Sequence, residues 1–228
     1  MDLGSEKAAM EFIEKFYEGE STGHDYWHSI RVYNMAMAIC DTEPEADRDI
    51  VGMAALLHDL DDRKLGGDEE NLPVASGFLK IHGATQSETK RIIEIIHQIS
   101  FKGEDSVVPA CIEGKIVQDA DRLDAIGAIG IARTFAYGGA HKRPIWNPNN
   151  RPKEKMSAEE YYGSRSDSIA HFYEKLLKLR SMMNTDEGKR VAQRRHDCML
   201  NPSSGVSLLD RTSEMLICKI IIGSDKLL

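Results

Sequence analysis

The sequence places two side chains that can bind a metal ion, His58 and Asp59, directly after an apolar run that begins at Met53. Imidazole nitrogens and carboxylate oxygens are ordinary ligands of divalent metals. A buried charge is costly unless it is paired or coordinated, so such a pair at the end of a buried helix marks a candidate metal site. An isolated His-Asp pair is more often a helix end with a capping aspartate, and the hypothesis therefore depends on finding further ligands.

A second imidazole comes from the segment 24–32, which contains two histidines. His24 follows Gly23 and precedes Asp25, a pattern that is typical of a turn and a helix cap. His28 falls on the helix that follows, next to apolar residues, and imidazole is the commonest side-chain ligand for metals of this kind. We predict His28 as a metal ligand and keep His24 as the weaker alternative.

Carboxylate ligands are available in the segment 118–127, which contains Asp119, Asp121 and Asp124. Residues two apart on an α-helix point about 200° away from each other, so Asp119 and Asp121 cannot both face one metal. Asp121 and Asp124 share a face, and the apolar residues around them indicate that this helix is largely buried. We predict Asp121 as a metal ligand and Asp124 as a group that orients a ligand or contacts the substrate.

Helices must position these side chains, and apolar periodicity predicts helices along most of the chain. Strand signals are scarce, so the predicted fold class is all-α, with one domain over residues 1–200. The segment 109–137 is expected as one long helical segment, open to a bend, in which Ala and Gly allow close packing. The other expected helices cover residues 5–19, 26–40, 46–60, 85–100, 164–183 and 186–199.

The composition of the 228-residue chain bounds its function. Hydrophobic residues make up 41%, enough for one sizeable core. The formal net charge of -8 and the sequence pI of about 5.5 argue against a general nucleic-acid binder, which needs clustered Lys and Arg. Four widely spaced cysteines form no CxxC pair, and the sequence shows neither a signal peptide nor a membrane-spanning run. We therefore expect a cytoplasmic protein without disulfides.

Two segments depart from the helical pattern. Residues 138–163 begin with a run of Gly, Pro, Asn and basic residues, which predicts a basic loop that either covers an anionic ligand or is a solvated excursion. Residues 201–228 form a C-terminal tail in which Met215–Ile222 is apolar and β-branched enough to resemble a strand. Such a tail packs on the core, packs on a second copy of the chain in a homodimer, or is a simple terminal extension, and these alternatives remain open.

Taken together, these patterns resemble the HD-domain superfamily of metal-dependent phosphohydrolases. The likeness rests on the strings at 24–32, 57–59 and 119–127, and as a pattern it extends over residues 20 to 200. These strings resemble those of the small stand-alone bacterial and archaeal members of the superfamily. The resemblance implies a compact helical bundle of the HD type that hydrolyses phosphoester or phosphoanhydride bonds, commonly in nucleotides.

The resemblance also implies that one divalent metal ion is bound by His28, His58, Asp59 and Asp121. Two imidazoles and two carboxylates leave positions for water and phosphate on an octahedral metal, for which we expect Mn²⁺, with Fe²⁺, Co²⁺, Ni²⁺ or Mg²⁺ as alternatives. Asp62 lies four residues after His58 and shares its face if the helix continues. We predict Asp62 as a general base or water-positioning group, and the alternative is a solvated acid beyond the helix end.

Binuclear members of the resembling superfamily bind a second metal through extra histidines from the middle of the chain. His82 and His97 are the candidates in this sequence, and they do not complete such a set. We therefore expect a single metal and predict His97 as a catalytic or substrate-contacting group. The alternative for His97 is a core histidine without a role in catalysis.

Substrate phosphates need positive charge near the metal. Arg31 lies one helical turn beyond His28 and can reach the same region. For Lys175 the alternative is a surface ion pair, because charged helix residues usually face solvent. The predicted phosphate contacts are Arg31, Lys64, Lys102 and Lys175, with Lys142 and Arg143 as lid residues of the basic loop.

The expected substrate is a small phosphorylated molecule, first a nucleoside triphosphate or its deoxy form, and stable binding of nucleic acid or of a membrane is not expected. Two other functions stay open. A phosphodiesterase for a cyclic or dinucleotide signal would be favoured by a second metal. A metal-containing nucleotide sensor without turnover would keep the ligands and lack a competent base, so replacing Asp62 would change little.

Overall fold

The computed structural model describes residues 3–20, 23, 25–63, 66–164 and 166–200. Helices supply the regular structure of these ranges, and no strand occurs within them, which confirms the predicted all-α fold class. The predicted tail, residues 201–228, lies outside the described residues. The longer helices are α1 (Leu3–Phe16), α2 (Tyr26–Cys40), α3 (Arg48–Leu57), α4 (Pro73–Ile81), α5 (Gln86–Ile99), α6 (Ile112–Asp124), α7 (Gly127–Ala140) and α11 (Asp186–Leu200).

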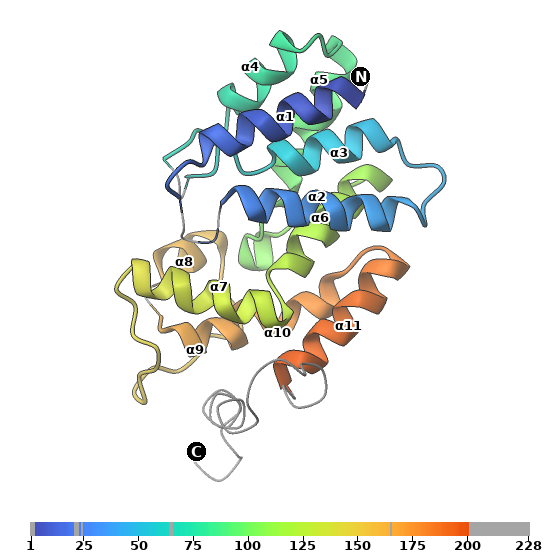
Figure 1. The fold of residues 1–228 in the computed structure, drawn as a ribbon. Coiled ribbons are helices and arrows are strands. Elements are labelled where there is room, and N and C mark those ends of the chain that lie inside the picture. Colours follow the sequence, from blue (N-terminus) through green and yellow to red (C-terminus); the bar gives the residue numbers. More distant parts are fainter. Residues whose placement is uncertain (1–2, 21–22, 24, 64–65, 165, 201–228) are drawn as a thin grey trace.

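The centre of the fold is the packing of α2 against α3 and α6 (Figure 1). α3 begins after Asp47, whose side chain accepts a hydrogen bond from Ile50 N, and every residue in Ile50–Leu57 is buried. A helix that is apolar on all sides must lie inside a bundle. The end of α3 is therefore held deep in the protein, and His58 and Asp59 follow directly after it.

The segment beyond Asp59 is anchored by the start of α4. Asp61 is 1% exposed, and its two carboxylate oxygens accept hydrogen bonds from Val74 N and Ala75 N, both 3.0 Å long. These are free backbone donors of the first helical turn, which an acidic side chain stabilises. Asp61 therefore caps α4 and holds the chain in place just after the His-Asp pair.

The predicted helical segment 109–137 is two helices, α6 and α7, which separate at Ala125 and Ile126. Gly127 has a φ of +79°, in the left-handed region that favours glycine. A Cβ atom on Gly130 would lie 2.2 Å from Ala125 O, so this close approach also requires glycine. The glycines that the sequence suggested for close packing therefore end the first helix and turn the chain into the second.

The predicted helix 164–183 is a series of short helical turns. A π-helical turn forms its middle, and such turns are frequent at functional sites. The turns are α9 (Ser168–His171), the π-helical turn Phe172–Leu176, α10 (Leu177–Leu179) and a 3₁₀ turn over Arg180–Met182. The sequence showed the apolar periodicity of this segment and not its irregular hydrogen bonding.

The predicted basic loop, residues 138–163, begins with the last residues of α7, is exposed along most of its length and includes α8 (Ala158–Gly163). Asp167 is 3% exposed and accepts hydrogen bonds from Asn147 N (3.1 Å) and Asn150 Nδ2 (2.9 Å). These bonds hold the loop beside α9. None of the described helices is both long and apolar enough to cross a membrane.

Candidate metal centre

His28 lies in the first turn of α2, where Asp25 accepts a hydrogen bond from His28 N (2.8 Å). Its side chain is buried, and its Nδ1 donates a hydrogen bond to Asp124 Oδ2 on α6 (2.7 Å). A carboxylate can only accept, so the ring proton lies on Nδ1. His28 Nε2 is then the ring nitrogen that would bind a metal ion.

His58 is oriented by the end of α3. Its Nδ1 donates a hydrogen bond to Ala55 O (2.8 Å), so the ring proton lies on Nδ1 here as well. His58 Nε2 is buried and has no hydrogen-bond partner among the described residues. A buried polar atom without a partner is unfavourable. Coordination of a metal ion by His58 Nε2 would supply the missing partner.

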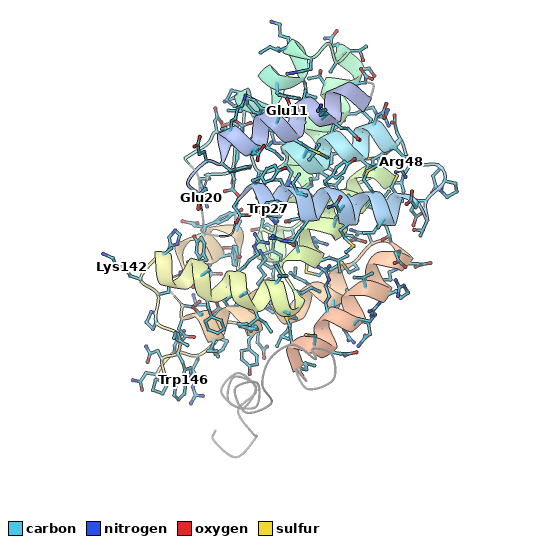
Figure 2. The ribbon with its side chains drawn as sticks, in the orientation of Figure 1. Glu11, Glu20, Trp27, Arg48, Lys142 and Trp146 are labelled. Carbon is cyan, nitrogen blue, oxygen red and sulfur yellow. The ribbon has the colours of Figure 1, made fainter. Side chains whose placement is uncertain are left out.

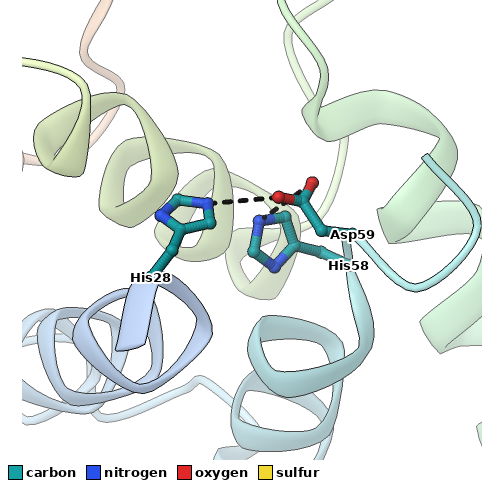
Figure 3. A group of neighbouring side chains, drawn as sticks. All are labelled: His28, His58 and Asp59. Atoms are coloured by element: carbon teal, nitrogen blue, oxygen red, sulfur yellow. Dashed lines mark ion pairs between the residues drawn. The ribbon is translucent and has the colours of Figure 1, made fainter. Parts of the chain in front are cut away.

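The four predicted metal ligands come together. Figure 3 shows His28, His58 and Asp59 pointing toward one another, and their ligand atoms lie within 4.8 Å of each other. His28 Nε2 is 3.2 Å from Asp59 Oδ2, and His58 Nε2 is 3.3 Å from Asp59 Oδ1. Asp121 Oδ1 lies 3.5 Å from His28 Nε2 and 3.8 Å from His58 Nε2. Two imidazoles and two carboxylates are a donor set that fits an octahedral divalent metal.

Asp124 orients His28 and is itself held by two arginines. It accepts hydrogen bonds from Arg31 Nε (2.7 Å), Arg31 Nη2 (3.0 Å) and Arg133 Nη1 (2.7 Å). Burial raises the pKa of Asp124, but the bonds from His28 and Arg31 and the charge of Arg133 outweigh burial, so the pKa lies well below its usual range. Asp124 therefore stays ionised and directs His28 Nε2 toward the cluster. The sequence predicted Arg31 as a phosphate contact, but in the structure its guanidinium donates its hydrogen bonds to Asp124.

A cavity of about 230 Å³ opens beside the cluster, and Asp59 and Asp121 form part of its wall. Charged groups of both signs line it. Aromatic rings form another part of its wall, and they belong to Phe101, Tyr137, Tyr161 and Tyr162. The cavity therefore joins potential metal ligands, cations and flat apolar surfaces in one space.

Some of the predicted catalytic and substrate residues lie at this cavity. They are Asp62, Arg143 and Lys175. Lys175 Nζ lies 5.2 Å from the ring centre of Phe101 and 5.9 Å from that of Tyr161. The π-helical turn carries Lys175 to this position.

Other predicted residues lie elsewhere. His97 is exposed on α5, and neither His97 nor Lys102 lines the cavity. Lys142 is exposed and points outward from the fold (Figure 2), also away from the cavity lining. His82 is exposed as well, so the structure brings neither middle histidine to the metal cluster. Lys64 lies outside the described residues.

Three arginines that the sequence analysis did not select line the cavity: Arg63, Arg122 and Arg133. The guanidinium of Arg63 lies 3.9 Å from the ring centre of Tyr162, which links the segment after α3 to α8. Arg122 follows the predicted ligand Asp121 directly, and that adjacency was the available signal. Arg133 lies on α7, beyond the break that ends α6. Its spacing from Asp121 and Asp124 in the sequence therefore does not show that it faces the cavity.

Relatives with known sequences and structures cover most of the chain. Residues 26–126 match the family model of the HD domain. Bacillus subtilis YpgQ is 41% identical over 193 residues, which is 83% of this chain and 85% of YpgQ. The crystal structure of YpgQ in complex with ADP matches with a TM-score of 0.68 at 36% identity, covering 88% of this chain and 92% of YpgQ.

Two further crystal structures are similar. A Lactobacillus plantarum protein matches with a TM-score of 0.77 at 34% identity, covering 87% of this chain and 93% of its own. An HD-superfamily hydrolase from Bacillus thuringiensis matches with a TM-score of 0.63 at 40% identity, covering 85% and 89% of the two chains. HD domains bind a divalent metal ion, and the His28, His58 and Asp59 cluster is able to hold one. The chain therefore belongs to the HD-domain phosphohydrolase superfamily.

Proposed function

We propose that the protein is a metal-dependent phosphohydrolase of nucleotides, with nucleoside triphosphates and their deoxy forms as substrates. One observation carries this proposal: the metal-ligand cluster opens, through Asp59 and Asp121, onto a cavity that also presents cations and aromatic rings. Phosphate groups need positive charge, and a nucleobase needs a flat apolar surface. The cavity offers both beside the place where a phosphoryl bond would be cut.

His28, His58, Asp59 and Asp121 would hold a divalent metal ion, which would make a water molecule more acidic and act as a Lewis acid toward a phosphoryl oxygen. Asp62 lines the same cavity. In the proposed reaction Asp62 accepts the proton of the attacking water or orients that water for attack. A proton acceptor in this role must be a carboxylate. Replacing Asp62 by asparagine would keep the size and shape of the side chain but remove its ability to accept the proton.

Lys175 is the first candidate for the substrate phosphates. Its ammonium group is held beside Phe101 and Tyr161, and it makes no ion pair with a carboxylate of the described residues. A cation that lies against aromatic rings and is not neutralised by an acid is available for an anion. Arg143 brings a second positive charge from the basic loop to the cavity wall. The ring of Tyr162 and its neighbours offer stacking surfaces for the base.

A relative supports a nucleotide as the ligand. The crystal structure of Bacillus subtilis YpgQ is a complex with ADP, and YpgQ is 41% identical to this chain over 193 residues. ADP contains a base and a phosphoanhydride, for which the cavity offers aromatic rings and cations. Exposure of His82 and His97 away from the cluster favours a single metal, and so favours this proposal over a binuclear phosphodiesterase.

Product analysis tests the proposed function. Purified, metal-stripped protein is incubated with nucleoside mono-, di- and triphosphates and cyclic nucleotides, with and without Mn²⁺, and the products are separated by ion-exchange chromatography. We expect Mn²⁺-dependent conversion of triphosphates, and the phosphate-containing product identifies the bond that is cut. Conversion of cyclic nucleotides alone would favour the phosphodiesterase. Folded, metal-loaded protein that converts nothing in the panel would contradict the proposal.

A further inference from the structure

Arg122 is a buried arginine in the wall of the cavity. It follows Asp121 on α6, is 3% exposed and contributes to the cavity lining. Arginine stays protonated in proteins and is almost never fully buried unless it is paired. This position therefore places a full positive charge where little water reaches it.

This guanidinium has no hydrogen-bonded ion pair among the described residues, although the carboxylates of Asp119 and Asp121 lie near enough to act on its charge. The guanidinium donates one hydrogen bond, from Nη1 to Met182 O (2.5 Å), while Nε is buried without a hydrogen-bond partner. No carboxylate of the described residues forms an ion pair with Arg122. Asp119, on the same helix, accepts its hydrogen bonds from Asn184 and Thr185 instead. A buried guanidinium nitrogen without a hydrogen-bond partner is unfavourable, which points to a missing acceptor at the cavity wall.

We propose that Arg122 binds a phosphate group of the substrate, which supplies the hydrogen-bond acceptor that the described residues do not. This inference rests on the proposed function, because it names a contact within the same nucleotide site. The planar guanidinium presents donors whose geometry matches phosphate oxygens. Asp121 and Arg122 are consecutive and both line the cavity, so the phosphate bound by Arg122 lies near the metal cluster.

Arg133 and Arg63, which also line the cavity, differ from Arg122 in their bonding. Arg133 is neutralised by Asp124, to which it donates a hydrogen bond of 2.7 Å. Arg63 lies against the ring of Tyr162 and is exposed, so its charge is solvated. Arg122 combines burial with a guanidinium Nε that has no hydrogen-bond partner among the described residues, and an anion bound in the cavity would supply that partner.

A matched control exists in Arg195. Its Nη1 donates a hydrogen bond to Leu123 O (2.5 Å), the same kind of bond that Arg122 makes to Met182 O, but Arg195 does not line the cavity. Removing either guanidinium deletes an anchor to a backbone carbonyl. Only the change at Arg122 removes a charge from the cavity.

The test uses methylenediphosphonate, an analogue of pyrophosphate that cannot be hydrolysed, titrated into Mn²⁺-loaded protein in a calorimeter. Arg122→Met is expected to weaken binding about tenfold to a hundredfold, as expected for the loss of a hydrogen bond between charged groups. Arg195→Met is expected to bind the analogue as the unchanged protein does. The Mn²⁺ content of each protein is measured by elemental analysis.

Undiminished binding by Arg122→Met would overturn the inference. Loss of the metal from that variant, or an equal loss of binding in both variants, would also overturn it, because Arg122 would then act only as an anchor. If Arg122→Met does not fold, Arg122→Lys keeps the charge and a donor for Met182 O but loses the planar fork. Binding about tenfold weaker is expected there, and unchanged binding would again overturn the inference.

The readout separates this inference from the proposed function, since the analogue is bound and never turned over. If nucleotides are not substrates but the analogue binds through Arg122, the proposed function fails and the contact stands. If nucleotides are hydrolysed and Arg122→Met binds the analogue normally, the contact fails and the proposed function stands.

Discussion

On α6, Asp119 and Asp121 are two residues apart and have different surroundings. Asp119 is fully buried and accepts hydrogen bonds from Asn184 N (2.9 Å), Thr185 N (2.8 Å) and Thr185 Oγ1 (2.8 Å). The side chain of Asp121 is 27% exposed, lines the cavity and lies 3.5 Å from His28 Nε2. A carboxylate saturated by protein donors stabilises a fold, whereas one that faces imidazole lone pairs is suited to binding a cation.

The space around each carboxylate supports the same contrast. A Cβ atom on Gly188 would lie 2.3 Å from Asp119 Oδ2, so α11 approaches Asp119 too closely to leave room for a ligand. Asp121 borders a cavity of about 230 Å³. The two faces of α6 therefore have separate tasks: the Asp119 face joins α6 to α11, and the Asp121 face forms the site.

The largest expected effect comes from Asp121→Ala. We expect metal affinity to fall by more than about a hundredfold, because loss of even an outer hydrogen-bond partner of a ligand costs about 10- to 100-fold. Hydrolysis should fall to background and the midpoint of thermal unfolding of the metal-free protein should change little. Elemental analysis of the folded variant measures the effect. Retention of a full equivalent of metal would remove Asp121 from the ligand set.

Asp62→Asn sharpens the contrast, because it tests a cavity carboxylate that is not a predicted ligand. We expect kcat to fall about 10²- to 10⁴-fold, the usual contribution of a general base, with metal content unchanged. Steady-state kinetics with Mn²⁺ measures this. Asp61→Asn is the neighbouring control, since Asp61 caps α4 and should affect stability while sparing kcat. A normal kcat in Asp62→Asn would favour another base or a non-catalytic sensor.

Asp119→Ala tests the structural face of α6. The change leaves donors of Asn184 and Thr185 without an acceptor, and each unsatisfied buried group costs about 1 to 3 kcal/mol. We expect the free energy of unfolding to fall by about 3 kcal/mol, measured by chemical denaturation of the metal-free protein. Metal binding by the folded fraction should persist. If Asp119→Ala instead abolished metal binding in folded protein, the division between the two faces would be wrong.

The smallest expected effect comes from Asp124→Asn, one turn beyond Asp121. An amide at this position no longer fixes the proton on His28 Nδ1 or neutralises Arg31 and Arg133. We expect metal affinity to fall about 10- to 100-fold, as for other partners of metal-bound histidines, with the metal still bound at saturating Mn²⁺. Competition with a chelator measures the affinity. An affinity equal to that of the unchanged protein would show that Asp124 does not orient His28.

Local patterns in the sequence were sufficient to select the four predicted metal ligands, whose side chains lie close together in the structure. Each residue of an α-helix is rotated by a fixed angle from the one before it, so Asp119 and Asp121 must point in different directions wherever the helix lies in the fold. The apolar run before His58 shows that the pair follows a buried helix. The structure places His28, His58, Asp59 and Asp121 together.

Long-range packing decides which cations reach the cavity, and the sequence could not show it. The break at Gly127 turns α7 so that Arg133 reaches Asp124, and docking of α8 places Tyr162 beside Arg63. Lys142, by contrast, is exposed at a position with a φ of 55° and lies away from the cavity. Arg63 and Arg122 do line the cavity and lie next to Asp62 and Asp121 in the sequence, so proximity in sequence identifies some of its cations and misses others.

Locating the bound metal in a crystal would show whether His28, His58, Asp59 and Asp121 form its site. Crystals of protein reloaded with Mn²⁺ are measured at a wavelength where manganese scatters anomalously, and the anomalous peaks are located. We expect one peak, bound by Nε2 of His28 and His58 and by carboxylate oxygens of Asp59 and Asp121. A peak elsewhere, with no manganese between these four side chains in protein that still hydrolyses nucleotides, would contradict the account.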